Sequence, residues 1–366
     1  MRPARVAVML AGVAALAALS ACSDVRYLAQ AAGGQLDLLR RARPIADVLA
    51  DPATGAQVRR KLELVGRVRA FATGELGLPD HGSFLEYVDV GRPAVVWNVF
   101  SAPPDSVHLR TSCFPIAGCV TYRGYFHEAD ARAYADTRRA AGDDVSVGGV
   151  SAYSTLGYLK DPVLSTMLNS GDAGLIRTVI HELAHPALYV KDDTIFNESF
   201  ATAIEEAGMR RWLKKYGTPE LAQADRLAQE RAAGFEKLLL QTRGELEALY
   251  ARNLPAAEVQ IRKAQVIQTL NDRYAALKAS WGGYAGYDGW FARGANNASL
   301  GAVAAYATLV PDFLALLERH GGSSHLHQGG SRMRGAAQCR AAVLPEGQVG
   351  EALAPAPGVP HRLKKT

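Results

Sequence analysis

The segment His181-Glu182-Leu183-Ala184-His185 stands inside an apolar stretch that runs from about Leu175 to Leu188. We expect a helix over residues 173–190 here, because apolar residues recur at helical spacing. Two histidines four residues apart on a helix project from the same face, one turn from each other. Neutral imidazoles are good zinc ligands, and two at this spacing can share one tetrahedral ion. The segment therefore predicts a metal site on a buried helix.

Glu182 directly follows His181, which places it about 100° further around the helix. It borders the expected metal without binding it, and is placed to take a proton from a water that the metal acidifies. Two histidines on an ordinary surface helix are the alternative, but the apolar residues around the motif argue against it. We therefore expect one Zn²⁺ per chain, with His181 and His185 as ligands and Glu182 as general base.

A catalytic zinc usually takes three protein ligands and keeps one position open. A second motif, Asn197-Glu198-Ser199-Phe200-Ala201, opens another expected helix after a short connection. A glutamate that is favoured only by the helix dipole is the alternative reading of Glu198. Glu205 and Glu206 are weaker candidates for the third ligand, since Glu205 lies two turns further, about 10 Å along the helix axis.

The two motifs together resemble the gluzincin metallopeptidases, in which the Glu of the second motif is the third ligand. Carried over, that ligand is Glu198. From about Tyr27 to His320 the chain also resembles a family of proteobacterial lipoproteins described as predicted zinc-dependent aminopeptidases. The segments that carry this resemblance include Val96–Phe100, Cys113–Pro115, Tyr122–Phe126, Ala152–Gly157, His181–His185, Phe196–Thr202 and Asn296–Leu300. The resemblance implies a peptidase that acts on a peptide substrate.

The chain departs from the family pattern in two places. Pro186 follows His185, where the family usually has Gln, and a proline inside a helix costs about 3 kcal/mol or more. From Gly321 the chain becomes rich in Gly, Arg and Pro. Pro186 favours a first alternative, a catalytically inactive zinc-fold envelope lipoprotein. The second alternative is an endopeptidase that acts on cell-wall peptides.

The N-terminus has the pattern of a bacterial signal peptide. Arg2 and Arg5 precede an uncharged apolar run over residues 6–19, which ends in Leu19-Ser20-Ala21-Cys22. The run is short for a membrane span and typical of a signal segment. The ending resembles a lipobox, which implies cleavage after residue 21, a lipid on Cys22 and an outer-membrane anchor facing the periplasm. An ordinary secretion signal with a chance cysteine is the alternative.

Export makes a disulfide between Cys113 and Cys119 the favoured interpretation, with two buried thiols as the alternative. The formal net charge of +5 comes from the two ends of the chain, and the body is close to neutral. We therefore expect no nucleic-acid partner.

The expected fold class is α+β and, by the resemblance, zincin-like. A small mixed sheet within residues 84–156 packs beside the two zinc helices: a hairpin of residues 87–90 and 94–100, a strand over 120–126 and a strand over 144–156. A helix over residues 128–141 interrupts these strands. The expected domain, residues 22–320, divides into a sheet-containing half to about 190 and a helical half, with two long antiparallel helices within 221–279. Residues 321–366 are an expected disordered tail.

Candidates for binding substrate are less specific. Tyr153, Tyr189 and Tyr306 are possible hydrogen-bond donors to a developing oxyanion, although core packing explains each of them better. Glu205 or Glu206 would suit the acidic anchor that an aminopeptidase needs for a free amine, and Glu205 also suits a place behind the metal ligands.

Overall fold

The computed structural model describes residues 25–114, 118–152, 155, 159–190, 193–307 and 309–319, without the side chains of residues 194 and 304–307. The expected signal segment, Cys22, Tyr153 and the tail from Gly321 lie outside these residues, as does the side chain of Tyr306. Within the described part of the chain, no helix combines the length and the hydropathy needed to cross a bilayer.

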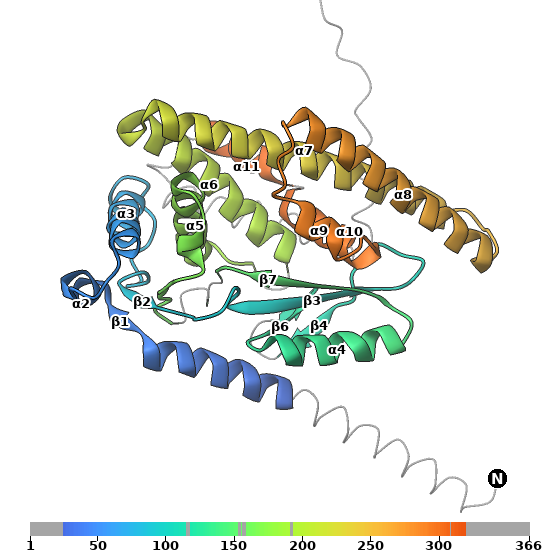
Figure 1. The fold of residues 1–366 in the computed structure, drawn as a ribbon, viewed down its shortest axis with the longest axis horizontal. Coiled ribbons are helices and arrows are strands. Elements are labelled where there is room, and N and C mark those ends of the chain that lie inside the picture. Colours follow the sequence, from blue (N-terminus) through green and yellow to red (C-terminus); the bar gives the residue numbers. More distant parts are fainter. Residues whose placement is uncertain are drawn as a thin grey trace, which may run out of the picture.

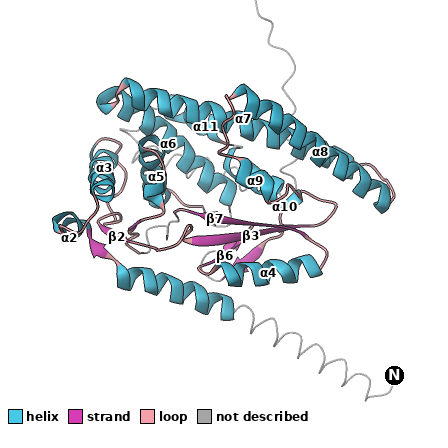
Figure 2. Cartoon of the chain, viewed as in Figure 1, coloured by secondary structure: helices cyan, strands magenta, loops and turns pink. Residues whose placement is uncertain are grey.

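The fold is α+β, as expected, with a thin layer of strands between helices (Figures 1 and 2). Its longest strands are β3 (Val96–Ala102) and β7 (Asp144–Val150), which pair antiparallel along their whole length. β6 (Arg123–Tyr125) pairs antiparallel with the other edge of β3, which gives the order β6-β3-β7. The β-branched and aromatic residues of β3 suit this central position, because both faces of the strand are buried.

One face of this sheet is covered by α4 (Glu128–Ala140), close to the predicted helix over residues 128–141. Acidic residues in its first turn and arginines in its last turn complement the helix dipole. Gly142, at φ 87°, takes the left-handed conformation that follows the helix end. Ala131 and Ala135 are fully buried, and these small side chains let the helix approach Trp97 and its neighbours on the sheet.

The expected hairpin of residues 87–90 and 94–100 is wrong. β2 (Glu86–Val88) belongs to a second sheet, where it pairs antiparallel with β1 (Arg43–Pro44) and parallel with β8 (Val163–Leu164). The chain turns away at Gly91, which has φ 66° and donates its N–H to Asp89 Oδ1. The two strands therefore belong to different sheets, and among the described residues the expected single mixed sheet is two three-stranded sheets and one two-stranded sheet.

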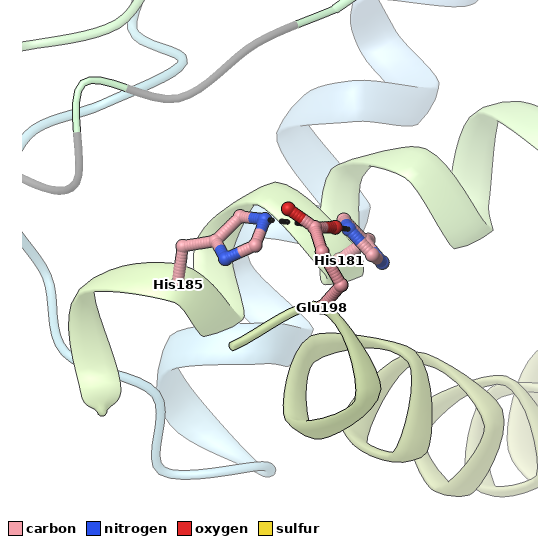
Figure 3. A group of neighbouring side chains, drawn as sticks. All are labelled: His181, His185 and Glu198. Atoms are coloured by element: carbon pink, nitrogen blue, oxygen red, sulfur yellow. Dashed lines mark ion pairs between the residues drawn. The ribbon is translucent and has the colours of Figure 1, made fainter. Parts of the chain in front are cut away.

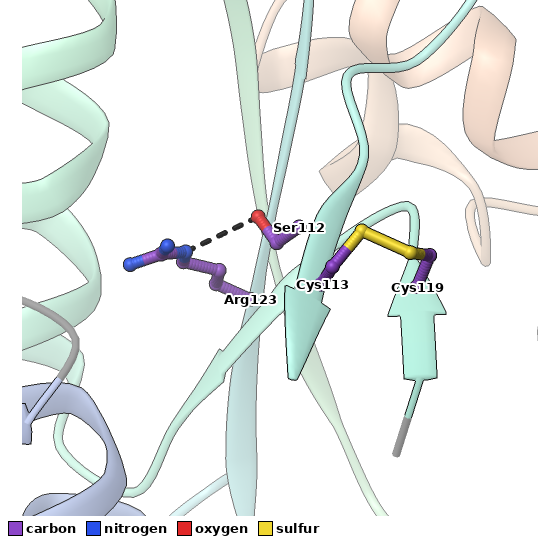
Figure 4. The surroundings of a disulfide bond; sticks show 4 residues. All are labelled: Ser112, Cys113, Cys119 and Arg123. Atoms are coloured by element: carbon purple, nitrogen blue, oxygen red, sulfur yellow. Dashed lines mark hydrogen bonds between the residues drawn. A yellow bond between two sulfur atoms is a disulfide. The ribbon is translucent and has the colours of Figure 1, made fainter. Parts of the chain in front are cut away.

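The two-stranded sheet is formed by β4 (Ser112–Phe114) and β5 (Gly118–Val120). Cys113 and Cys119 lie directly opposite each other in its register and form a disulfide (Figure 4). Arg123 Nε donates to Ser112 Oγ at 3.2 Å and ties this ribbon to β6 (Figure 4). The expected strand over residues 120–126 is thus two short strands, β5 and β6, that belong to different sheets.

The main hydrophobic core lies beside the sheets, where helices from both halves of the chain meet. The helices that contribute to it are α2 (Ile45–Ala50), α3 (Ala56–Gly74), α5 (Asp172–Ala184), α6 (Thr194–Tyr216) and α11 (Val310–Arg319). A further helix over residues 25–41 precedes them, adds the buried side chain of Leu38 to this core and lies next to α4 (Figure 1). The core spans residues 38 to 317, so the two expected halves share one hydrophobic interior.

Two long antiparallel helices, α7 (Pro219–Tyr250) and α8 (Ala256–Ser280), lie side by side above this layer, as predicted (Figure 1). Thr218 caps α7 by accepting from Leu221 N, and Pro219 occupies the first turn, where its missing N–H costs nothing. Leu239, Leu246 and Leu270 are fully buried between the pair. α9 (Asp288–Ala292) and α10 (Asn297–Ala307) lie between this pair and the sheet.

Candidate metal centre

His181 lies in the last turn of α5, and the helix ends three residues later at Ala184. His185 and Pro186 belong to the 3₁₀ turn η2 (His185–Ala187), so the helix expected to continue to residue 190 is shorter than predicted. Proline cannot continue an α-helix, but it is common immediately beyond a helix end. The prediction that Pro186 strains the helix is therefore wrong, because Pro186 lies outside α5 and interrupts no helical hydrogen bond.

The connection from α5 to α6 is closed by Asn197. Its Oδ1 accepts from the N–H of Val190 at 2.8 Å, and its Nδ2 donates to the carbonyl of the same residue at 2.7 Å. Asp193 caps α6 by accepting from Phe196 N at 2.9 Å. These bonds hold the start of α6 close to Val190, in the segment that follows α5. Glu198, the next residue after Asn197, is thereby brought over the two histidines.

The other residues of the second motif are packing residues. Phe196 and Phe200 both contact the ring of Phe313 on α11, at 5.1 and 5.7 Å between centroids. Ala201 is completely buried. Further along α6, a Cβ at Gly208 would lie 3.0 Å from Ile180 Cγ2, so glycine allows a close approach of α6 to α5 beside His181. The motif therefore fixes both the side chain of Glu198 and the helix that carries it.

His181, His185 and Glu198 converge at one point (Figure 3). Glu198 Oε2 lies 3.4 Å from His181 Nε2 and 4.0 Å from His185 Nε2. One possible ligand atom from each residue lies within 4.8 Å of the others. Ligand atoms about 2.0–2.1 Å from a tetrahedral zinc are separated by roughly 3.3 Å. The donor set and its spacing therefore fit a zinc ion with small adjustments of the side chains.

Glu205 lies on the far side of the His181 ring from Glu198. Its Oε2 is 3.2 Å from Nδ1 of His181, and its Oε1 accepts from Arg177 NH1 at 3.0 Å. Arg177 in turn donates from Nε and NH2 to the two carboxylate oxygens of Asp225, at 2.6 and 3.0 Å. Glu205 thus contacts a candidate ligand histidine through the nitrogen that does not face Glu198.

Burial and neighbouring charges shift the pKa values of Glu182, His185 and His181. Burial raises the pKa of Glu182 to about 7, with His181 acting against this shift and Glu198 with it. Burial also lowers the pKa of His185 to about 4, and His181 adds to that shift. For His181 the burial effect is outweighed by its contacts with Glu198 and Glu205, which raise its pKa to about 10. The carboxylates therefore favour positive charge between them, which a metal cation would supply.

The family model described as "Putative aminopeptidase" matches residues 26–339. The chain belongs to this family. The match runs from the start of the first helix through α11, and it ends inside the Gly-, Arg- and Pro-rich segment that begins at Gly321. Neither the curated proteins nor the solved structures contain a match to the chain.

Glu205 and Glu206, the residues expected to provide an acidic anchor for a free amine, each contact a basic side chain. Glu205 is engaged by His181 and Arg177, and Glu206 lies 3.6 Å from Arg210 on the same helix. Glu205 also lies behind a candidate metal ligand, the second place expected for it.

Three residues near the site were missed by sequence reasoning. Two of them are Arg177 and Asp225, and Arg177 carries a local signal because it stands one helical turn before His181.

The third residue, Tyr122, follows the disulfide ribbon and precedes β6. Burial, then Glu198, raises the pKa of Tyr122, and Tyr189 and Glu182 act in the same direction. Tyr122 is therefore within electrostatic range of the site, whereas Tyr189, one of the three tyrosines considered from the sequence, is 38% exposed.

Proposed function

We propose that this protein is a zinc-dependent metallopeptidase of the aminopeptidase type. The observation that carries the proposal is the convergence of His181, His185 and Glu198 on one point. Membership of the aminopeptidase family supports a peptidase independently of that geometry. Two imidazoles and one carboxylate are a ligand set used by catalytic zinc sites in peptidases.

The roles of the residues follow from their positions. His181, His185 and Glu198 hold the metal, and zinc, when bound, supplies a Lewis acid that polarises the peptide carbonyl and acidifies water. Glu182 lies next to His181 without being a member of the ligand group, and its Oε2 is buried with no hydrogen-bond partner among the described residues. That carboxylate is placed to accept a proton from the attacking water and to return it to the leaving amine.

The outer edge of β7, in the β6-β3-β7 sheet, is an argument for a peptide substrate. In the described part of the chain, β7 pairs with β3 alone, which leaves its other edge outside the sheet. Val145 O on this edge accepts from Asn296 Nδ2 at 3.0 Å, so the start of the edge is covered. We place an extended peptide along the later part of the strand, toward Val150, where main-chain pairing would hold it.

The proposed location is the periplasmic side of the outer membrane, with the lipid on Cys22 as the anchor. The disulfide between Cys113 and Cys119 supports an oxidising compartment, because such bonds persist outside the cytosol.

Metal analysis and a substrate comparison test the proposal. The full chain is expressed with its own N-terminus, purified in detergent and analysed for bound zinc, which we expect at about one per chain. Peptides with free and with acetylated N-termini are then compared. Cleavage of the free peptides alone supports an aminopeptidase. Cleavage of both supports an endopeptidase, and bound zinc with no cleavage of a peptide library contradicts peptidase activity.

A further inference from the structure

The geometry points to Arg177 and Asp225 as positioning residues that act on the metal site through Glu205, an inference that rests on the proposed zinc site. Neither residue belongs to the group of candidate ligands. They form a chain of contacts that runs from Asp225 on α7, through Arg177 on α5 and Glu205 on α6, to His181. Three helices that are separate in the sequence are thereby joined to one ligand.

The first link sets the orientation of the His181 ring. Glu205 Oε2 is 3.2 Å from Nδ1, so a carboxylate at this position accepts the Nδ1 proton. The tautomer with its proton on Nδ1 has its lone pair on Nε2, the atom that lies 3.4 Å from Glu198. A histidine ligand that donates its other N–H to a carboxylate is held in the tautomer and the ring orientation that metal binding needs.

The second link holds Glu205 itself. Its two oxygens are divided, with Oε1 on Arg177 and Oε2 on His181. Rotation of the carboxylate away from His181 would therefore break the contact with Arg177 as well. All three side chains are largely removed from water, with exposed fractions of 11% for Arg177, 18% for Glu205 and 10% for Asp225. At this burial, the contacts are screened much less than surface ion pairs are.

The third link fixes the guanidinium. Asp225 accepts two hydrogen bonds from Arg177, through Nε and NH2, which leaves NH1 directed at Glu205. This two-point contact sets the plane of the guanidinium as well as its position. Loss of Asp225 would leave Arg177 its charge but remove this restraint. An ion pair that served only to join helices would need no such division of its donors between two carboxylates.

Zinc affinity measured by competition with a chromophoric chelator tests the inference in the full chain. We expect Glu205→Gln to weaken zinc binding by about 10–100-fold and Asp225→Asn by about tenfold. The visible absorption spectrum of the Co²⁺-substituted protein should change in both variants, because the geometry of a ligand changes. The thermal midpoint of the metal-free protein is measured in parallel, so that general destabilisation is seen separately.

Asp172→Asn is the matched control. Asp172 also forms ion pairs from α5, with Arg60 at 2.7 Å and Lys61 at 2.9 Å, but it stands at the opposite end of that helix from His181. We expect this variant to lower the thermal midpoint while zinc affinity and the Co²⁺ spectrum stay as in the wild type.

The outcomes separate the inference from the proposed function. Wild-type zinc affinity and spectrum in both Glu205→Gln and Asp225→Asn would overturn the positioning role, even if the protein cleaves peptides. Weakened zinc binding in these variants, with no peptide cleaved by the wild type, would support the positioning role and contradict the peptidase proposal. A wild type that binds no zinc would overturn both.

Discussion

Nε2 of His181 lies 3.4 Å from Oε2 of Glu198, so the last turn of α5 and the second turn of α6 meet at one point. The two residues come from different helices, and the contact exists because Asn197 closes the connection between them. This relationship places a carboxylate where a third metal ligand is needed.

Glu182→Gln should retain zinc at the wild-type level and lower kcat by about 10²–10⁴-fold, because the amide cannot accept a proton from water. Zinc content and peptide turnover are measured on the same purified sample. Glu258→Gln is a suitable control, since that residue pairs with Arg262 on α8 and lies outside the ligand group. Turnover that persists in Glu182→Gln would remove this residue from the mechanism.

Glu198→Ala should bind far less zinc than one ion per chain, because two histidines alone hold the ion poorly. Equilibrium dialysis followed by metal analysis measures the loss. Glu206→Ala, on the same helix, should bind zinc normally. A full complement of zinc in Glu198→Ala would mean that another group is the third ligand.

Asn197→Ala should lower the free energy of unfolding by about 2–4 kcal/mol, because two backbone groups of Val190 lose their partner. Zinc affinity should also fall, since the position of Glu198 depends on this closure. Urea unfolding and chelator competition give the two values. Reduced stability with unchanged zinc affinity would show that Glu198 reaches the histidines without the hydrogen bonds between Asn197 and Val190.

Asp143→Asn should destabilise the fold by about 2–4 kcal/mol at neutral pH. Asp143 is almost fully buried and accepts from Arg110 and Arg138. Burial alone would raise the pKa of Asp143, but the two arginines hold it below 3.8. The ionised Asp143 therefore stabilises the fold fully at pH values above 3.8, the ordinary pKa of an aspartate. This stabilisation is lost as the pH falls through the lower pKa that Asp143 has in the folded protein.

The stability difference between wild type and Asp143→Asn should therefore shrink as the pH is lowered below 3.8. Urea unfolding at a series of pH values follows this difference. A difference that stays constant over the whole series would show that the ionisation of Asp143 does not contribute to it.

Cys22→Ser should abolish lipid attachment, because a serine has no thiol to acylate. Metabolic labelling with a fatty acid, followed by membrane fractionation, checks the result. The variant should leave the membrane fraction and carry no label, while Cys339→Ser should behave as the wild type does. Label that remains on Cys22→Ser would contradict the lipobox.

Much of the candidate site was accessible from sequence because helical spacing is local. The four-residue spacing of His181 and His185 predicts a shared face whatever the surrounding fold, and Glu182 follows from the same geometry. The boundary at Pro186 was misjudged for an equally local reason. A single proline could either strain a continuing helix or end it, and the sequence does not distinguish the two.

Short stretches of sequence predict the two candidate histidine ligands, the candidate general base, a helix over residues 128–141 and the pairing of Cys113 with Cys119, because each depends on residues close together in the chain. The tertiary structure was needed to show that β2 and β3 lie in different sheets, and that Asp225, Arg177 and Glu205 form a chain of contacts to His181. These contacts depend on where helices α5, α6 and α7 cross. Crossings are set by the packing of many buried side chains, which no short stretch of sequence encodes.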